Sequence, residues 1–173
     1  MIDRKDASVE FLNLFFPIHY LVGIQIEDAL KCGILTRQQA CILWLIRTQG
    51  ENGTSMRRKD IEIALSGWYE VTSSAISKSL RALAKPPMDL LSMSEDPNSG
   101  REKVVTLTPR GRQYLGSMIQ NGIALMDAMV ARMTDDEVVN GISFLKRVTD
   151  ISEEIQDDET ALSTRARQVK AKT

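Results

Sequence analysis

The sequence predicts a mainly helical chain with one small β-hairpin, which is an α+β fold. Two short apolar patterns of helical spacing lie within residues 56–85, and two strand-like runs follow over residues 90–107. Longer apolar patterns of helical spacing occupy both ends of the chain. With 173 residues and 43% hydrophobic content, the chain is large enough to bury a core, and it contains no internal repeat or Gly/Ser-rich linker.

The first short helix is expected over residues 56–65. Ile61, Ala64 and Leu65 share one helical face that can pack inward, while Arg57 and Arg58 stay in solvent. This pattern is typical of a supporting helix.

A second helix is expected over residues 71–85, after a turn. Thr72 or Ser73 can cap its first turn. Pro86 and Pro87 end it, because proline has no amide hydrogen and restricts the residue before it. Its outward face carries small hydroxyl and basic side chains, which are Ser73, Ser74, Ser77, Lys78 and Arg81.

The hairpin is expected from two strands, residues 90–93 and 104–107, joined by a turn-rich loop with Arg101 near its tip. Thr108 then supplies a helix cap, and Pro109 stands at the first helical position, where a missing donor costs nothing. Helix, turn, helix, hairpin and helix is the order of a winged helix-turn-helix.

A lobe of this kind predicts binding of double-stranded DNA. Hydroxyl side chains at a helix start can approach phosphates or base edges, and lysine and arginine reach phosphate or guanine. A basic wing tip reaches the minor groove or its phosphates. The alternative, that this helix face and loop tip are exposed to solvent and bind nothing, remains open. The expected DNA-binding residues are Arg57, Arg58, Ser73, Ser74, Ser77, Lys78, Arg81, Arg101 and Lys103.

The distribution of charge supports this lobe better than the total charge does. The whole chain has 22 basic and 23 acidic residues, which alone argues against a nucleic-acid-binding protein. Residues 54–112 carry 10 Lys or Arg against 7 Asp or Glu, whereas both flanking regions are net acidic. DNA binding is therefore expected to depend strongly on salt.

The motifs along the chain resemble those of the multiple-antibiotic-resistance regulator (MarR) family. They are Leu35-Thr36 with Gln38-Gln39, Arg58-Lys59-Asp60-Ile61 with Ala64-Leu65, Ala75-Ile76-Ser77-Lys78, and Asp96-Pro97 through Arg101 to Val105-Thr106-Leu107-Thr108-Pro109-Arg110-Gly111. Ser99 stands where the family usually has an aspartate. The resemblance implies a homodimeric transcriptional regulator, a repressor more often than an activator, that binds a pseudo-palindromic operator through recognition helices about 34 Å apart.

The apolar run over residues 11–26 is interpreted as a buried helix that also meets a second subunit. It is shorter than the roughly 20 apolar residues of a membrane span and contains Asn13, Pro17 and His19, so no membrane partner is expected. Pro17 is expected to kink or restart the helix. Apolar stripes over residues 109–133 and 135–155 complete the expected dimerisation region.

These patterns divide the chain into four expected parts. Residues 1–35 form an N-terminal dimerisation helix, residues 36–112 the DNA-binding lobe, and residues 113–157 the C-terminal dimerisation helices. Residues 158–173 are expected to be a frayed tail, because they hold few apolar anchors.

A small-molecule effector is a further expectation, with a pocket where the N-terminal, second and wing elements meet. Its possible lining residues are His19, Tyr20, Trp44 and Arg47. Some relatives sense oxidants through a cysteine of the N-terminal helix, so Cys32 is an alternative redox site, whereas Cys41 is expected to be buried.

Other classes of function find little support in the sequence. The single histidine and two cysteines form no metal-binding spacing, and no glycine-rich phosphate loop or nucleophile motif is present. We therefore expect no enzyme, no cofactor and no metal, in a cytoplasmic protein. A winged-helix module for protein assembly remains the alternative, because the lobe's net charge of +3 is modest.

Overall fold

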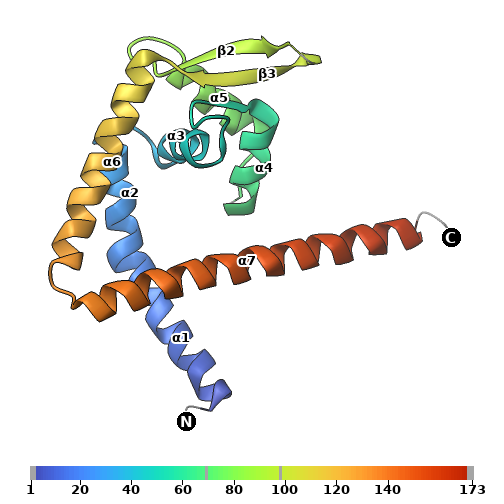
Figure 1. Ribbon diagram of the computed structural model, residues 1–173. Helices are drawn as coiled ribbons and strands as arrows, with labels where there is room; N and C mark the ends of the chain where they lie inside the picture. Colours follow the sequence, from blue (N-terminus) through green and yellow to red (C-terminus); the bar gives the residue numbers. More distant parts are fainter. Residues whose placement is uncertain (1–2, 69, 98, 171–173) are drawn as a thin grey trace. The chain divides into compact units, whose positions relative to one another are not determined.

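The computed structural model describes residues 3–68, 70–97 and 99–170, except for the side chains of residues 100–101 and 157–170. Two compact units divide the chain, Met1–Met126 and Asp127–Thr173. Figure 1 labels the α-helices and the strands β2 and β3. The order of the elements is α1 Arg4–Ile18, η1 His19–Gly23, α2 Ile24–Lys31, α3 Arg37–Gln49, β1 Ser55–Arg57, α4 Arg58–Trp68, α5 Ser73–Leu83, β2 Leu91–Asp96, β3 Ser99–Leu107, α6 Pro109–Val130 and α7 Asp135–Lys170.

The N-terminal segment is one continuous helical run, in which α1 passes through the π-helical turn η1 into α2. Asp3 caps its start, and Pro17 lies inside α1. Proline cannot donate the usual helical hydrogen bond, and a π turn follows directly, with the Ile24 amide donating to the His19 oxygen. The predicted kink or restart at Pro17 is therefore replaced by a local widening of the helix.

No residue of α1 is buried within the chain, so the buried helix expected over residues 11–26 is wrong for a single copy. The run Arg4–Lys31, of 28 residues, is also long and apolar enough to cross a membrane by length and composition alone. The argument that this segment is too short to span is therefore wrong, because the helix extends beyond residues 11–26 at both ends. Core helices of soluble proteins can have the same length and apolar content, so these two properties alone do not place the segment in a membrane.

The core of the first unit lies between α3, α4, α5, the sheet and the start of α6. Helix α3 begins with a capping box, in which the Gln39 amide donates to Thr36 Oγ1 and the Thr36 amide donates to Gln39 Oε1. Its apolar stripe is fully buried, because it packs against α4, α5 and β1. The largest fully buried side chains are Ile42, Leu43, Leu45, Ile46, Ile61, Leu65, Ile76, Leu80, Leu83, Leu90, Leu91 and Leu107.

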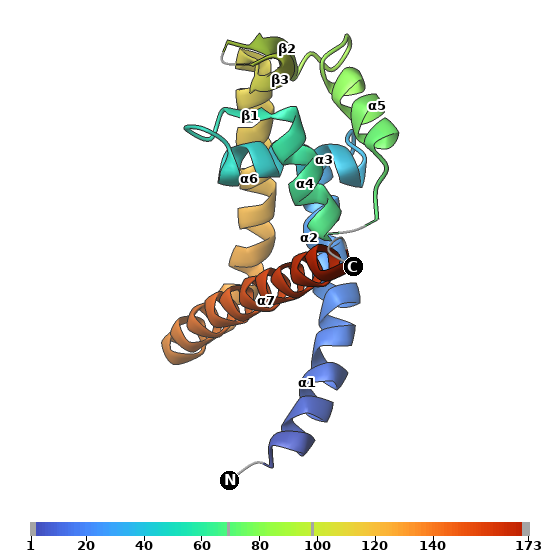
Figure 2. The ribbon, with the colours of Figure 1, turned by 90° about the vertical axis from the view of Figure 1, so that its right-hand side faces the viewer.

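The sheet has three antiparallel strands in the order β1-β3-β2, where the sequence predicted only the β2–β3 hairpin. Strand β1 pairs Met56 with Val105, so the segment predicted as the start of a helix is extended as far as Arg57. Strands β2 and β3 are longer than predicted and form the wing, with a register shift at Glu95 and Asp96. Figure 2 shows β1 in the turned view.

Helix α6 begins at Pro109, as the sequence predicted. The Gly111 amide donates to Thr108 Oγ1 at 2.9 Å, and the Thr108 hydroxyl donates to the backbone oxygen of Asp89 at 2.7 Å. A Cβ at Gly111 would overlap the backbone oxygen of Leu90. The helix start is thus locked against the end of the turn that precedes β2.

In the second unit, a second capping box starts α7. The amide of Thr134 donates to Glu137 Oε2 at 2.8 Å, and the amide of Glu137 donates to Thr134 Oγ1 at 3.3 Å. Hydrogen bonds from the backbone and side chain of Thr134 lower the pKa of Glu137. The helix continues to Lys170, well past the end near Ile155 that the apolar stripe predicted.

Candidate nucleic-acid interface

Helix α5 is the second helix of the helix-turn-helix, and its residues divide cleanly between two faces. Thr72 caps it by accepting a hydrogen bond from the Ala75 amide at 3.2 Å. Ile76, Leu80 and Leu83 are buried against the core, as their spacing predicted. On the other face Ser73, Ser74, Lys78 and Arg81 are exposed and Ser77 is half-buried. The structure therefore gathers five of the predicted site residues on one helix face.

Arg58 joins this face from the first residue of α4. Its Nη2 donates to Ser73 Oγ at 3.0 Å and to Ser77 Oγ at 2.9 Å, and it lies 3.4 Å from Glu62 Oε2. Arg58 thus links the two helices of the motif. Sequence reasoning placed Arg58, Ser73 and Ser77 among the DNA contacts without detecting that they bind one another, because the link spans 15 and 19 positions of sequence.

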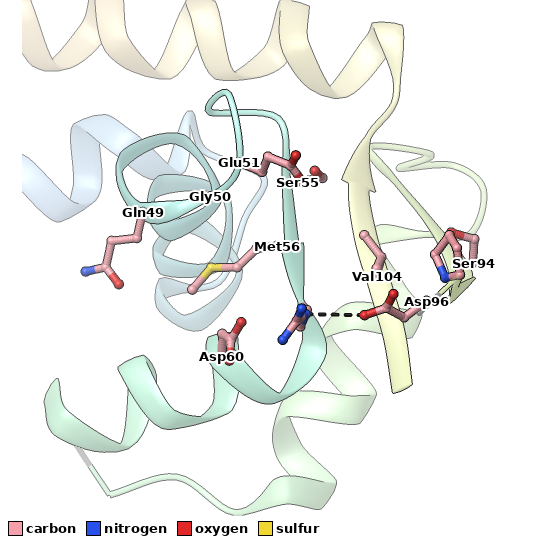
Figure 3. Close-up of a pocket in the computed structure, with 11 residues that line it drawn as sticks. Gln49, Gly50, Glu51, Ser55, Met56, Asp60, Ser94, Asp96 and Val104 are labelled. Carbon is pink, nitrogen blue, oxygen red and sulfur yellow. Dashed lines mark ion pairs between the residues drawn. The ribbon is translucent and has the colours of Figure 1, made fainter. Parts of the chain in front are cut away.

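Arg57, the neighbouring residue, reaches the wing instead. Its Nε lies 3.2 Å from Asp96 Oδ2, and the dashed line in Figure 3 marks this ion pair. The Asp96 side chain is only 5% exposed, whereas that of Arg57 is 55% exposed. The pair lines a cavity of about 660 Å³ between the end of α3, β1, the start of α4 and the wing, and Glu51 and Asp60 also line this cavity.

The wing itself presents mixed charge. Lys103 is exposed and lines a hollow of about 430 Å³ together with Arg58, Lys59, Glu62 and Glu102. The backbone of Arg101 belongs to β3, but its side chain lies outside the described residues. Its role at the wing tip therefore stays a prediction.

The four predicted effector-binding residues do not line one pocket among the described residues. His19 and Tyr20 form an edge-to-face pair on η1, and Arg47 is exposed on α3. Trp44 does line an apolar cavity of about 250 Å³ between α2, α3 and α4. The remaining lining residues are Glu27, Leu30, Arg37, Ala40, Cys41 and Trp68. Trp68 was missed because it follows the predicted supporting helix by several positions.

Cys32, the predicted redox residue, ends α2 in the left-handed conformation with φ 49°. Asn121 Nδ2 on α6 lies 3.3 Å from its sulfur, and the Tyr114 hydroxyl donates to the Lys31 oxygen at 3.0 Å. Burial raises the pKa of Tyr114 to about 12, with a smaller contribution from Cys32. Cys41, which was predicted to be buried, is half-buried instead, because it faces the apolar cavity.

Within the part of the chain that the structure describes, no group of three or more His, Cys, Asp or Glu side chains is arranged to hold a metal ion.

Residues 35–111 match a family model described as a winged helix DNA-binding domain. This part of the chain has a winged helix fold. The matched residues include α3, α4, α5 and the whole sheet, so the domain carries every element of the interface described above. No curated protein matches the chain.

Solved structures of bacterial proteins share this fold. Wild-type MarR from E. coli is 22% identical with a TM-score of 0.62, and the match covers 79% of this chain and 93% of that one. A MarR mutant from E. coli complexed with operator DNA is 21% identical with a TM-score of 0.60, covering 85% and 99%. YusO from Bacillus subtilis is 16% identical with a TM-score of 0.57, covering 85% and 94%. These likenesses confirm the MarR resemblance at the level of the fold.

Proposed function

We propose that the chain is a homodimeric, sequence-specific DNA-binding transcriptional regulator, acting as a repressor more often than as an activator, in the cytoplasm. One observation carries the proposal. Helix α5 projects an exposed face of hydroxyl and basic side chains from residues that match a winged helix DNA-binding domain, beside a wing that exposes Lys103. A helix of this composition fits a major groove.

In this proposal the exposed α5 residues contact DNA most directly. Lys78 and Arg81 would reach phosphate or guanine, and Ser74, near the helix start, would approach a phosphate. Lys103 and Arg101 would track the backbone or the minor groove from the wing. The residues outside the 36–112 lobe, 1–35 and 113–157, would supply the dimer contacts.

The exposed apolar surface of α1 supports the dimer. The side chains of Leu12 and Phe16, one helical turn apart, are 68% and 64% exposed. Seven further large apolar residues of α1 and η1 are also exposed, which are Val9, Phe11, Leu14, Phe15, Ile18, Tyr20 and Leu21. An exposed apolar surface of this kind marks a contact with another protein or with a membrane, and the proposal assigns it to a second copy of the chain.

The apolar cavity between α2, α3 and α4 is the proposed effector site. Trp44 and Trp68 offer aromatic walls, and the ion pair between Arg37 and Glu27 lies among its lining residues. Apolar walls with a few polar groups suit a small aromatic ligand with one polar end. A similar fold belongs to BpsR of Bordetella bronchiseptica, whose DNA binding is regulated by 6-hydroxynicotinic acid. A ligand here would act by favouring one spacing of the recognition helices.

The deciding experiment selects bound sequences from a random duplex pool with purified protein at two salt concentrations. We expect an enriched pseudo-palindrome with half-sites one helical turn apart, about 34 Å, and affinity that falls steeply with salt. Absent or salt-insensitive affinity for duplex DNA would favour the protein-assembly alternative.

A thiol-based redox regulator is the second candidate function. The observation that favours it is a side-chain contact of Cys32, whose sulfur lies 3.3 Å from Asn121 Nδ2 on α6. Operator release by peroxide in the wild-type protein and not in Cys32→Ser would support this candidate. An unchanged peroxide response in the variant would remove it.

A further inference from the structure

We propose that Arg57 and Arg58 act as a positioning pair that fixes the wing and the recognition helix to one point of the backbone, and that neither guanidinium is primarily a phosphate contact. The proposal rests on DNA binding as the proposed function and goes beyond it. Sequence reasoning treated both arginines as DNA-binding residues. Their contacts assign them a different role.

The two side chains leave adjacent backbone positions at the junction of β1 and α4. Arg57 Nε pairs with Asp96 Oδ2 in the wing at 3.2 Å, and Arg58 Nη2 donates to Ser73 and Ser77 on α5. The wing and α5 are thus both tied to one dipeptide. A shift of either element would have to break its own contact or move the other.

Burial of the Asp96 carboxylate makes its ion pair with Arg57 important for the position of the wing. The Asp96 carboxylate is 5% exposed, so it needs a cation or hydrogen-bond donors, and it lies at the register shift where β2 and β3 lose regular pairing. Strand pairing is therefore weakest there, and a side-chain contact has most influence on wing position. The ion pair would set how far the wing stands from β1.

The Arg58 contact has a parallel effect on α5. Ser73 and Ser77 lie one turn apart near the start of the helix, and one guanidinium binds both. Glu62, 3.4 Å away on α4, holds the same guanidinium from the other side. The helix is thereby fixed in rotation about its own axis, which decides which side chains face a groove.

The test compares the wild type with Arg57→Gln, Asp96→Asn and the double variant. Fluorescence anisotropy measures their affinity, over a series of salt concentrations, for a duplex that the wild type recovers from a random pool. A positioning pair predicts that each single change weakens binding about tenfold and that the double variant binds no more weakly than either. The slope of log affinity against log salt stays at the wild-type value.

If Arg57 instead contacted a DNA phosphate, the variants would change the affinity and the salt slope differently. Asp96→Asn would then strengthen binding, because it removes a negative charge and frees Arg57, and Arg57→Gln would lower the salt slope by about one. Either result overturns the proposal for Arg57.

Lys59→Gln is the matched control, since Lys59 is the next residue and has no ion pair or hydrogen bond among the described side chains. The positioning role predicts that Arg58→Gln weakens DNA binding several-fold more than Lys59→Gln does. The slope of log affinity against log salt should not change in Arg58→Gln. Equal losses in both variants would overturn it, because charge alone would then account for the effect.

A second readout does not depend on DNA. Hydrogen exchange of the β2 and β3 amides should quicken in Arg57→Gln and in Asp96→Asn, with no further change in the double variant. If the wild type binds no duplex, the proposed function fails, while this exchange measurement still tests the wing contact. Unchanged exchange rates in the single variants, or additive increases in the double variant, would overturn the proposed wing contact.

Discussion

At the residue scale, the junction between the wing and α6 leaves no room for a side chain at Gly111. The backbone oxygen of Leu90 occupies the place of its Cβ, and Leu107 Cδ2 lies 3.3 Å from the same point. Thr108 holds both sides of this junction through its hydroxyl. The sequence predicted the cap at Thr108, but it did not reveal the close approach, because Leu90 is distant in the chain.

Gly111→Ala is expected to destabilise the fold by at least about 2 kcal/mol, because the added methyl forces the helix start away from Leu90. Thermal or urea unfolding measures the change. Gly116→Ala in the same helix is the control, since nothing lies within 4 Å of its Cβ position. It should leave stability unchanged or raise it by about 0.5–1 kcal/mol. Equal losses in both variants would contradict the close approach.

Tyr114 makes the stability of the folded chain depend on pH in the alkaline range. Its pKa is raised to about 12 from 10.0, so the folded state holds this proton more tightly than the unfolded state. The associated stability is present below pH 10 and is lost as pH rises towards about 12. An ultraviolet titration of the tyrosines should contain a component near pH 12 that is absent from Tyr114→Phe. A variant curve that keeps this component would contradict the assignment.

At the element scale, helix α5 was predictable and the strand before α4 was not. The apolar spacing of α5 and its stop before Pro86 are local properties of the chain, and both were predicted, while Thr72 proved to be the cap among the two predicted candidates, Thr72 and Ser73. Strand β1 is only three residues long, and it is extended because Met56 pairs with Val105 in β3. A three-residue strand carries no periodic signal, so only the fold reveals it.

Lys78→Ala and Arg81→Ala are expected to weaken duplex binding and to lower the salt slope by about one each, because both side chains are exposed and basic on α5. The dimer should remain intact in both variants, which sedimentation checks. Unchanged affinity in both would argue against α5 as the recognition helix.

The cap of α5 can be tested separately from its proposed DNA contacts. Thr72→Ala removes the acceptor of the Ala75 amide and should cost about 1 kcal/mol of stability. Urea unfolding measures this loss. A variant as stable as the wild type would show that the cap hydrogen bond contributes nothing.

At the scale of the whole molecule, α1 buries none of its residues within the chain and exposes a run of large apolar side chains. Leu12→Glu or Phe16→Glu should therefore convert a dimer to monomers, because a charge would lie in the apolar contact. Analytical ultracentrifugation measures the mass. Glu10→Gln, an exposed polar position on the same helix, is the control and should stay dimeric. Monomeric wild-type protein would contradict the proposed dimer.

Sequence alone determined the helix-turn-helix order, the wing, the cap at Thr108, the start of α5 at Thr72 or Ser73, and the polar face of α5, because capping and periodicity act between residues close in the chain. Only the tertiary structure decided the partners of Arg57 and Arg58, the third strand, and the cavity beside Trp44 and Trp68. Those features join side chains from distant segments, and their energies depend on distances that no local pattern encodes.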